Sequence, residues 1–402
     1  MPEFDPLSAD FFDDPYDTYR WLRDEAPVYH NERYGFWALS RFADVIAAHR
    51  DWKTFSSEHG LTIDQLTDPN QSMKHTSIIM MDPPEHDRMR KLVSRVFTPR
   101  AMAALEPMIR DVITSHLAPF DGTDAFDAVA DFSAPFPVEV ISVMLGVPKD
   151  DRQQIRHWTD LMLLREPGDP KPTQEGMEAG LRQITYFLDL IAEKRANLAD
   201  DMISRLTEVE VEDPISEGGD GSTHRLDDGE IAGFATLLAA AGSETVTKLI
   251  GNGVVLFARN PGEWQKVLDD PAKAQPAVEE VLRYWAPSQY QGRFTHRPAE
   301  YHGTTIPEGS PVFLVTGAAN RDEREYDDPD RFDIDRDQGL AVGLGHGIHS
   351  CLGAALARLE SKVAFEELRD RWPHYEIDEA GLRRVQMSNV AGFSNVPVSR
   401  AA

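Results

Sequence analysis

The sequence predicts a mainly α-helical protein with a smaller β-rich part, which is an α+β fold class. From about residue 85 to 287, apolar side chains recur every three or four positions, as on the buried face of amphipathic helices. A further helical pattern covers 351–372. Near the chain ends, at about 27–40, 289–317 and 373–399, short alternating stretches bounded by turn residues are typical of strands.

Composition and charge narrow the class of protein. The chain has 402 residues, of which 41% are hydrophobic, and a formal net charge of -27. This acidity argues against binding to nucleic acid or to an anionic membrane surface. The single cysteine excludes an internal disulfide and fits a reducing compartment. The N-terminus has no signal-peptide pattern. The longest apolar run, 231–242, is too short to span a bilayer. We therefore expect a cytoplasmic monomer that is not a membrane protein.

Residues 208–230 interrupt the helical pattern. They carry nine acidic side chains and one arginine, which predicts a mobile surface loop. Asp227 and Glu230, at the end of this stretch, have the spacing of a capping box. We therefore expect a helix to begin there and to bury the apolar run 231–242.

The lone cysteine, Cys351, follows a glycine-rich stretch and has several interpretations. It could be a small buried apolar residue. The glycines could form a dinucleotide-binding loop, but Ile348 stands where a third glycine belongs, and no βαβ pattern surrounds it. His346, His349 and Cys351 could bind zinc, although a structural zinc site needs four ligands.

An axial ligand to iron is the interpretation that explains most of this stretch. The helical pattern after Cys351 places the thiol near a helix N-terminus, where backbone N–H groups and the macrodipole favour a thiolate. The glycines let the backbone approach a flat ligand. A buried thiolate surrounded by donors is what a haem iron requires.

At this point the chain resembles the haem-thiolate monooxygenases of the cytochrome P450 family. The family signature is Phe-Gly-x-Gly-x-His-x-Cys-x-Gly, and residues 344–353 read LGHGIHSCLG. Leu344 stands where the family usually has phenylalanine. The resemblance implies that Cys351 is the metal ligand, and that Leu344, His349 and Gly353 lie in the cofactor-binding loop.

Residues 241–245, AGSET, resemble the distal-helix motif of the same family. The resemblance implies that Glu244 and Thr245 are catalytic. Splitting dioxygen consumes two protons, and a carboxylate next to a hydroxyl can relay them. The alternative is that Thr245 bonds back to its own helix while Glu244 lies in solvent.

The motif at 81–90, MDPPEHDRMR, places His86 and Arg90 one turn apart on a helix. The resemblance implies that these two residues bind the haem propionates together with Arg293 and His349. Two buried carboxylates need such donors.

Glu280 and Arg283 lie three residues apart in EEVLR, and Arg331 belongs to DPDRF. In the family these motifs supply a structural triad that holds the core on the haem side. Residues 317–336 match the family along most of their length.

The resemblance covers nearly the whole chain and implies one cytochrome P450 domain, 1–402, with a triangular helical body around a buried haem b (iron protoporphyrin IX). The implied activity inserts one atom of O2 into a lipophilic molecule, of terpenoid, steroid or fatty acyl type, by hydroxylation or epoxidation. The thiolate favours O–O cleavage. Because the chain has no flavin motif and too few cysteines for a cluster, electrons would come from NAD(P)H through a separate ferredoxin and ferredoxin reductase.

The family topology also implies positions for the substrate and the ferredoxin. The expected substrate pocket consists of Leu237, Ala240, Ala241, Gln289, Val390 and Phe393. The expected basic docking face consists of Lys91, Arg95, Arg100, Arg358 and Lys362.

Three other functions remain as alternatives. A peroxygenase would use hydrogen peroxide and would not need the alcohol of Thr245. A non-enzymatic haem sensor would need Cys351 but no proton relay. In a colourless metal-binding or structural protein, Cys351 would be inert.

Overall fold

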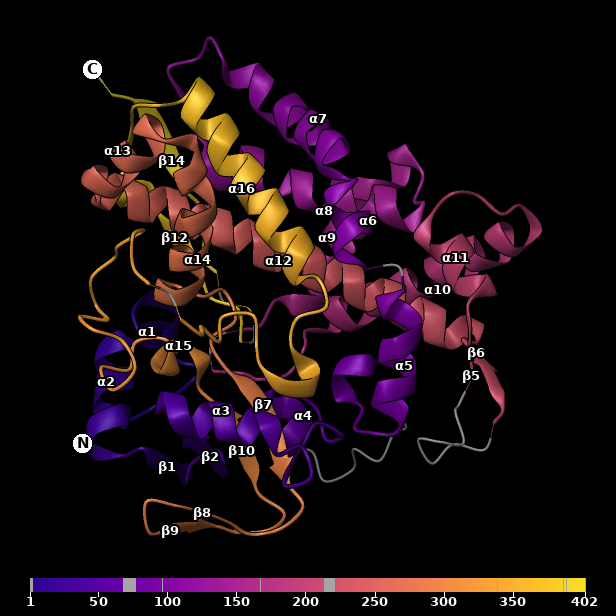
Figure 1. Cartoon of the computed structure of the whole chain (residues 1–402), viewed down its shortest axis with the longest axis vertical. Helices are drawn as coiled ribbons and strands as arrows, with labels where there is room; N and C mark the ends of the chain where they lie inside the picture. The colour runs from indigo at the N-terminus through magenta and orange to yellow at the C-terminus, as the bar shows by residue number, and fades with distance from the viewer. Residues whose placement is uncertain are drawn as a thin grey trace.

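The computed structural model describes residues 3–67, 77–95, 97–166, 168–212, 221–337, 339–385, 387 and 389–401. It is rich in helices with small sheets, which confirms the predicted fold class (Figure 1). The helices are α1 Ala9–Asp13, α2 Tyr16–Glu25, α3 Phe42–Arg50, α4 Ile63–Thr67, α5 Glu85–Ser94, α6 Pro99–Ala103, α7 Glu106–Leu117, α8 Pro135–Leu145, α9 Arg152–Leu163, α10 Gln174–Ala196, α11 Met202–Glu208, α12 Asp228–Arg259, α13 Pro261–Asp269, α14 Ala274–Tyr284, α15 Thr316–Ala319 and α16 Ala354–Arg371. The strands are β1 Val28–Asn31, β2 Phe36–Leu39, β3 Phe55–Ser56, β4 Ala125–Asp127, β5 Glu210–Glu212, β6 Thr223–Arg225, β7 Gln291–Thr295, β8 Ala299–Tyr301, β9 Thr304–Ile306, β10 Pro311–Leu314, β11 Tyr375–Ile377, β12 Arg383–Arg384, β13 Phe393–Asn395 and β14 Pro397–Arg400.

The largest sheet has the order β1-β2-β10-β7-β3 and occupies the lower part of the view in Figure 1. Strands β1 and β2 form the predicted hairpin, with Val28 opposite Leu39. Strand β10 runs parallel to β2 and antiparallel to β7, so that Val312 lies opposite Arg293. The sheet thereby fixes Arg293 on an inner strand.

Two strands fall where the sequence predicted a loop. Strands β5 and β6 pair as an antiparallel hairpin within 208–230, so the loop prediction was wrong at its two ends. Glu210 lies opposite Arg225, and their side chains form an ion pair. Opposite charges on facing positions stabilise such a pair of strands. Residues 213–220, the middle of the predicted loop, lie outside the described residues.

Helix α12 crosses the middle of the molecule and contacts α8, α9, α10 and α16 (Figure 1). It begins at the predicted capping box: the Glu230 N–H donates to the Asp227 carboxylate at 2.7 Å, and the Asp227 N–H donates to the Glu230 carboxylate at 2.9 Å. A Cβ at Gly253 would lie 2.5 Å from the Phe365 ring of α16. Glycine there lets the two long helices approach closely, so the predicted central helix is buried.

One stretch of the described chain, Ala128–Leu145, is long and apolar enough to cross a membrane by length and composition. About two thirds of it is buried inside the protein. It contacts α12 and therefore serves as a core helix in this fold.

Candidate active site

A cavity separates α12 from the loop that precedes α16. It encloses about 880 Å³ of empty space, including its mouth. Ala241 and Thr245 of α12 form one wall, and Leu344, Cys351 and Gly353 form the other. The predicted cysteine loop and the predicted distal helix therefore face each other across one space.

Glycine shapes the loop that carries Cys351. Gly345 and Gly347 both have φ of +70°, a conformation that other residues rarely adopt. A Cβ at Gly347 would lie 2.2 Å from the carbonyl oxygen of His49 in α3. The Cys351 N–H donates to the Leu344 carbonyl at 2.8 Å and closes the loop. As a result, α3 packs directly against the loop, and the thiol lines the cavity.

The electrostatics around Cys351 are balanced between opposing effects. Burial raises the pKa of the Cys351 thiol above its usual value. The Gly353 N–H, which donates to the sulfur, and the Arg90 and Arg358 guanidinium groups lower the pKa but do not overcome burial. The sequence-based expectation that the helix N-terminus favours a thiolate therefore describes one contribution only. A metal cation bound at the sulfur would complete the deprotonation.

Polar side chains of α5 and of the cysteine loop line one edge of the cavity, and Arg293 is not among the lining residues. The rings of His86 and His349 lie 4.5 Å apart, and each has a buried Nε2 with no hydrogen-bond partner among the described residues. Arg90 donates to the Ser350 carbonyl at 2.9 Å. Arg293 is buried, and burial lowers its pKa to about 10. Buried ring nitrogens without partners indicate a polar group that these residues are built to receive.

His49, which sequence reasoning did not single out, lies behind the cysteine loop, where its carbonyl meets Gly347. It is only 5% exposed, and neither ring nitrogen has an aligned hydrogen-bond partner among the described residues. Burial, together with Arg293 and His346, lowers its pKa to about 3, so the ring is neutral. One histidine on an amphipathic helix carries no sequence signal. Only the contact between α3 and the cysteine loop identifies it.

This set of residues fits a haem. The group is flat, carries two carboxylates and takes an axial thiolate. Cys351 would bind the iron, and the unpartnered ring nitrogens of His86 and His349, with Arg90 and Arg293, would hold the carboxylates.

Glu244 and Thr245 leave α12 in different directions. The Thr245 hydroxyl lines the cavity and donates to the Ala241 carbonyl at 2.7 Å. Glu244 is 4% exposed, and its Oε2 lies 3.1 Å from Lys248 Nζ. Within the described part of the chain, no hydrogen bond joins the two residues. Thr245 therefore does bond back to its own helix, whereas Glu244 does not lie in solvent.

The predicted structural triad needs one correction. Glu280 and Arg283 are both fully buried and form a two-pronged ion pair at 2.7 and 2.8 Å. The Arg331 side chain is 64% exposed and pairs with Asp333 instead. Arg331 contributes only its backbone carbonyl, which accepts from Arg283 at 3.3 Å.

Arg336 occupies the third position of the triad. Its Nε lies 3.5 Å from Glu280 Oε1, and its side chain is 10% exposed. It also donates to the carbonyls of Asp328 and Arg331 at 2.9 Å. The motif DPDRF thus contributes backbone carbonyls to the triad, and Arg336, five residues after Arg331, contributes the positive charge that faces Glu280.

The predicted substrate residues divide into two groups. Leu237 and Ala241 line the cavity. Ala240 is partly buried and does not line it. Val390 packs with Val385 and Met387 in a separate small cluster.

Gln289 and Phe393 turn away from the cavity, contrary to the prediction. The Tyr19 hydroxyl donates to Gln289 Oε1 at 3.0 Å, and Phe393 packs edge-to-face against Trp285. Gln291, the first residue of β7, lines an adjoining space of about 730 Å³ instead.

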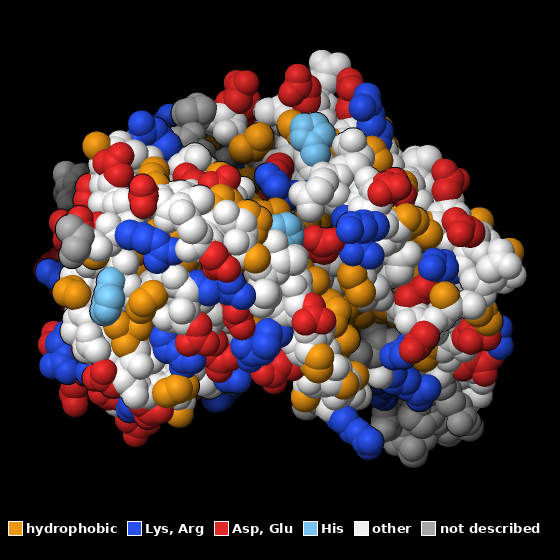
Figure 2. Space-filling view, turned by 90° about the horizontal axis from the view of Figure 1, so that it is seen from above, with side chains coloured by type: hydrophobic (Ala, Val, Ile, Leu, Met, Phe, Trp, Pro, Cys, Tyr) orange, Lys and Arg blue, Asp and Glu red, His pale blue; other side chains and the backbone are white. Residues whose placement is uncertain are grey.

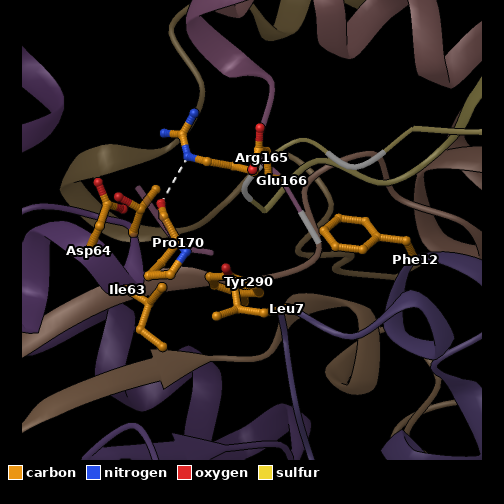
Figure 3. A pocket seen from close by; sticks show the side chains of 9 residues that line it. Leu7, Phe12, Ile63, Asp64, Arg165, Glu166, Pro170 and Tyr290 are labelled. Carbon is orange, nitrogen blue, oxygen red and sulfur yellow. Dashed lines mark hydrogen bonds between the residues drawn. The ribbon is translucent and has the colours of Figure 1, made fainter. Parts of the chain in front are cut away.

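A smaller pocket lies between the N-terminal segment, α4 and the chain after α9 (Figure 3). Arg165 lies on its wall and donates to the Pro170 carbonyl at 2.9 Å. The same guanidinium donates to the carbonyls of Met162 and Leu164. Because Arg165 is engaged with three backbone groups, it holds this segment in place and is not offered to a ligand.

Comparison with known proteins agrees with this geometry. A sequence profile of the family "Cytochrome P450" matches residues 274–372. A "Putative cytochrome P450 123" of Mycobacterium tuberculosis is 42% identical over 396 residues, which are 98% of this chain and 96% of that protein. This chain belongs to the cytochrome P450 family.

Other members of the cytochrome P450 family have named activities or ligands. An "Erythromycin C-12 hydroxylase" of Saccharopolyspora erythraea is 39% identical over 94% of this chain and 92% of that protein. The crystal structure of the cytochrome P450 CYP109E1 from Bacillus megaterium in complex with testosterone superposes with a TM-score of 0.86, at 32% identity, over 97% of this chain and 98% of that one. The chain is therefore a cytochrome P450 monooxygenase, and the family implies a haem cofactor.

Proposed function

We propose that this cytochrome P450 uses haem b to insert one oxygen atom from O2 into a lipophilic molecule of terpenoid, steroid or fatty acyl type. The observation that supports this most strongly is the cavity, in which apolar side chains of α12 face the Cys351 thiol. Ile78, Ile79, Phe234 and Leu237 line it. Relatives that hydroxylate erythromycin or bind testosterone support a large, mostly apolar substrate.

The chain's own residues prepare this chemistry. Bound haem would supply the activation of O2, and the overall reaction RH + O2 + 2e⁻ + 2H⁺ gives ROH + H2O. Cys351 would ligate the iron, while His86, Arg90, Arg293 and His349 would neutralise the carboxylates. Thr245 places its hydroxyl on the opposite wall, where it can hand on a proton. Glu244, one residue earlier, is the proton source proposed for Thr245.

The electrons are proposed to come from NAD(P)H through a separate ferredoxin and ferredoxin reductase in the cytoplasm. Two cations of the proposed docking face have acidic partners: Arg358 forms a two-pronged pair with Glu279, and Lys362 lies 3.2 Å from Glu366. Arg95 is exposed and bonds to a backbone carbonyl. On the face shown in Figure 2, acidic and basic side chains are interspersed, so an acidic partner would meet local cations despite the net charge of -27.

Testing this function starts with a screen of steroids, terpenoids and fatty acids for the change in haem spin state on binding. A compound that binds is then incubated with NADPH, a ferredoxin, its reductase and ¹⁸O2. We expect one ¹⁸O atom in the product. Product without label would contradict the proposal.

Replacement of Thr245 by alanine tests the relay and separates the alternatives. We expect NADPH consumption to continue while the product formed per NADPH falls by about 10²-fold, the usual scale of a lost proton-transfer group. Thr245→Ser, which keeps the hydroxyl, is the matched control. Unchanged coupling in Thr245→Ala, with full turnover driven by hydrogen peroxide, would indicate a peroxygenase.

A further inference from the structure

A cluster of charged side chains lies between α12 and α9, outside the lining of the cavity. It contains Glu244 and Lys248 of α12, which are both 4% exposed, and Asp160 of α9. Helices α9 and α12 pack together along this cluster. None of these side chains lines the cavity. Their arrangement therefore needs an explanation other than contact with the substrate.

The carboxyl groups of Asp160 and Glu244 meet without an intervening donor. Asp160 Oδ1 and Glu244 Oε2 are both buried, and neither accepts a hydrogen bond from any described donor. Lys248 Nζ lies 3.1 Å from Glu244 Oε2 but off the direction of a hydrogen bond. The two carboxyl groups are close enough to act on each other, so a proton on one could be donated to the other. A hydrogen bond between them requires a proton on one of them, because two carboxylates offer only acceptors.

Asp160 also reaches the protein surface. Its other oxygen, Oδ2, lies 3.5 Å from Arg156 Nε, one turn earlier on α9, and both side chains are 31% exposed. The charged groups that act on Asp160 are thus Arg156 on its own helix, and Glu244 and Lys248 on α12. Asp160 connects solvent on one side with buried Glu244 on the other.

The protonation of Asp160 is consistent with this geometry. Burial, together with the charge of Glu244 and the hydrogen bond to it, raises the pKa of Asp160 to about 7, although Arg156 and Lys248 oppose the shift. Asp160 can therefore gain and lose a proton near neutral pH.

We propose that Asp160 and Glu244 share one proton, and that Asp160 is the positioning residue that reloads Glu244 from solvent past Arg156. This inference rests on the proposed role of Glu244 and Thr245 and adds the step before it. A proton enters at Asp160 Oδ2, the proton between the carboxyls moves to Glu244, and Glu244 carries one proton onward to Thr245. The onward step needs the Glu244 side chain to turn from Lys248 toward the cavity. Each transfer leaves the pair ready for the next proton, so no net charge accumulates.

The shared proton can be tested directly by infrared difference spectroscopy of the haem-loaded enzyme below and above pH 7. We expect one carbonyl band of a protonated carboxyl group that disappears as the pH rises. Asp160→Asn and Glu244→Gln should each abolish this same band. Asp189→Asn, which changes an exposed aspartate on α10, should keep it. A band that survives in Asp160→Asn would overturn the proposal.

The reloading role is tested with the same variants, reconstituted with NADPH, a ferredoxin and its reductase, without added substrate. We expect Asp160→Asn to raise severalfold the fraction of electrons recovered as hydrogen peroxide and to remove the pH dependence of that fraction near pH 7. Asp160→Glu should restore the dependence. A pH profile in Asp160→Asn that matches the wild type would reduce Asp160 to a structural role and contradict the inference.

Failure of this inference and failure of the proposed function give different results. If Asp160→Asn leaves the band and the peroxide fraction unchanged while the reduced carbon monoxide complex keeps a thiolate spectrum, only the role of Asp160 is wrong. If the thiolate spectrum is absent, the haem-thiolate function itself is wrong, whatever the infrared result.

Discussion

Two buried glutamates of this protein differ in how their carboxylates are satisfied. Glu280 in α14 receives two N–H groups of Arg283 at 2.7 and 2.8 Å, and a backbone N–H at 2.9 Å. Glu244 in α12 lies near one lysine and faces a second carboxyl group, Asp160. Both glutamates are at most 4% exposed, so burial does not separate them.

The number of hydrogen-bond donors around each carboxyl group indicates a different role for Glu280 and for Glu244. A buried charge that is fully paired holds one geometry and stabilises the fold only as long as both partners remain. A buried carboxyl group that lacks donors keeps or shares a proton instead, and can therefore take part in proton transfer. The Glu280 site accordingly fixes the segment after α15, whereas the Glu244 site is suited to chemistry.

The largest expected effect comes from breaking the paired site. Arg283→Ala leaves Glu280 buried without its main partner, which should lower the free energy of unfolding by about 3–5 kcal/mol. Urea unfolding followed by circular dichroism measures this change. A loss below about 1 kcal/mol would contradict the structural role, since that is the value of an exposed pair.

A smaller loss of stability should show whether Arg336 or Arg331 is the third residue of the triad with Glu280 and Arg283. Arg336→Ala removes a buried guanidinium that contacts Glu280 and two carbonyls, so we expect a loss of about 1.5–3 kcal/mol. Arg331→Ala is the matched control. Its side chain is exposed, and the unfolding midpoint should not change. The reverse order of the two variants would restore Arg331 to the triad.

Glu360 in α16 is a further buried carboxyl group to compare with Glu244 and Glu280. Its Oε2 has no hydrogen-bond partner among the described residues. Burial raises the pKa of Glu360 well above its usual value, which favours the neutral acid in the folded protein. An acid whose pKa is raised in the folded state adds its full stability while the pH is below the unfolded-state pKa. This contribution to the free energy of unfolding is lost as the pH rises. Glu360→Gln should therefore gain stability relative to the wild type from pH 5 to pH 7, by up to about 1.4 kcal/mol per pH unit. A stability difference that does not change with pH would show that Glu360 is charged.

The sequence predicted much of the fold because its strongest signals are local. The two residues of the capping box, Asp227 and Glu230, lie three positions apart, and α12 begins where expected. Glycines with positive φ around Cys351 were likewise readable, because only local backbone geometry requires them.

The missed or misassigned residues depend on contacts between distant segments. His49 and Asp160 acquire a role only through packing of α3 on the cysteine loop and of α9 on α12. Gln289 was assigned to the cavity from the family topology, but its side chain accepts from the Tyr19 hydroxyl instead. Arg331 was chosen by motif, and the turn that follows brings Arg336 to Glu280 instead.

The account depends most on Cys351 as the thiolate ligand of a haem. The measurement that tests it most directly is the absorption spectrum of the purified protein after reduction under carbon monoxide, with Cys351→Ala measured in parallel. We predict a strongly red-shifted Soret band in the wild type that is lost in the variant. A wild-type protein that stays colourless after incubation with haem, or a variant that keeps the red-shifted band, would contradict the account.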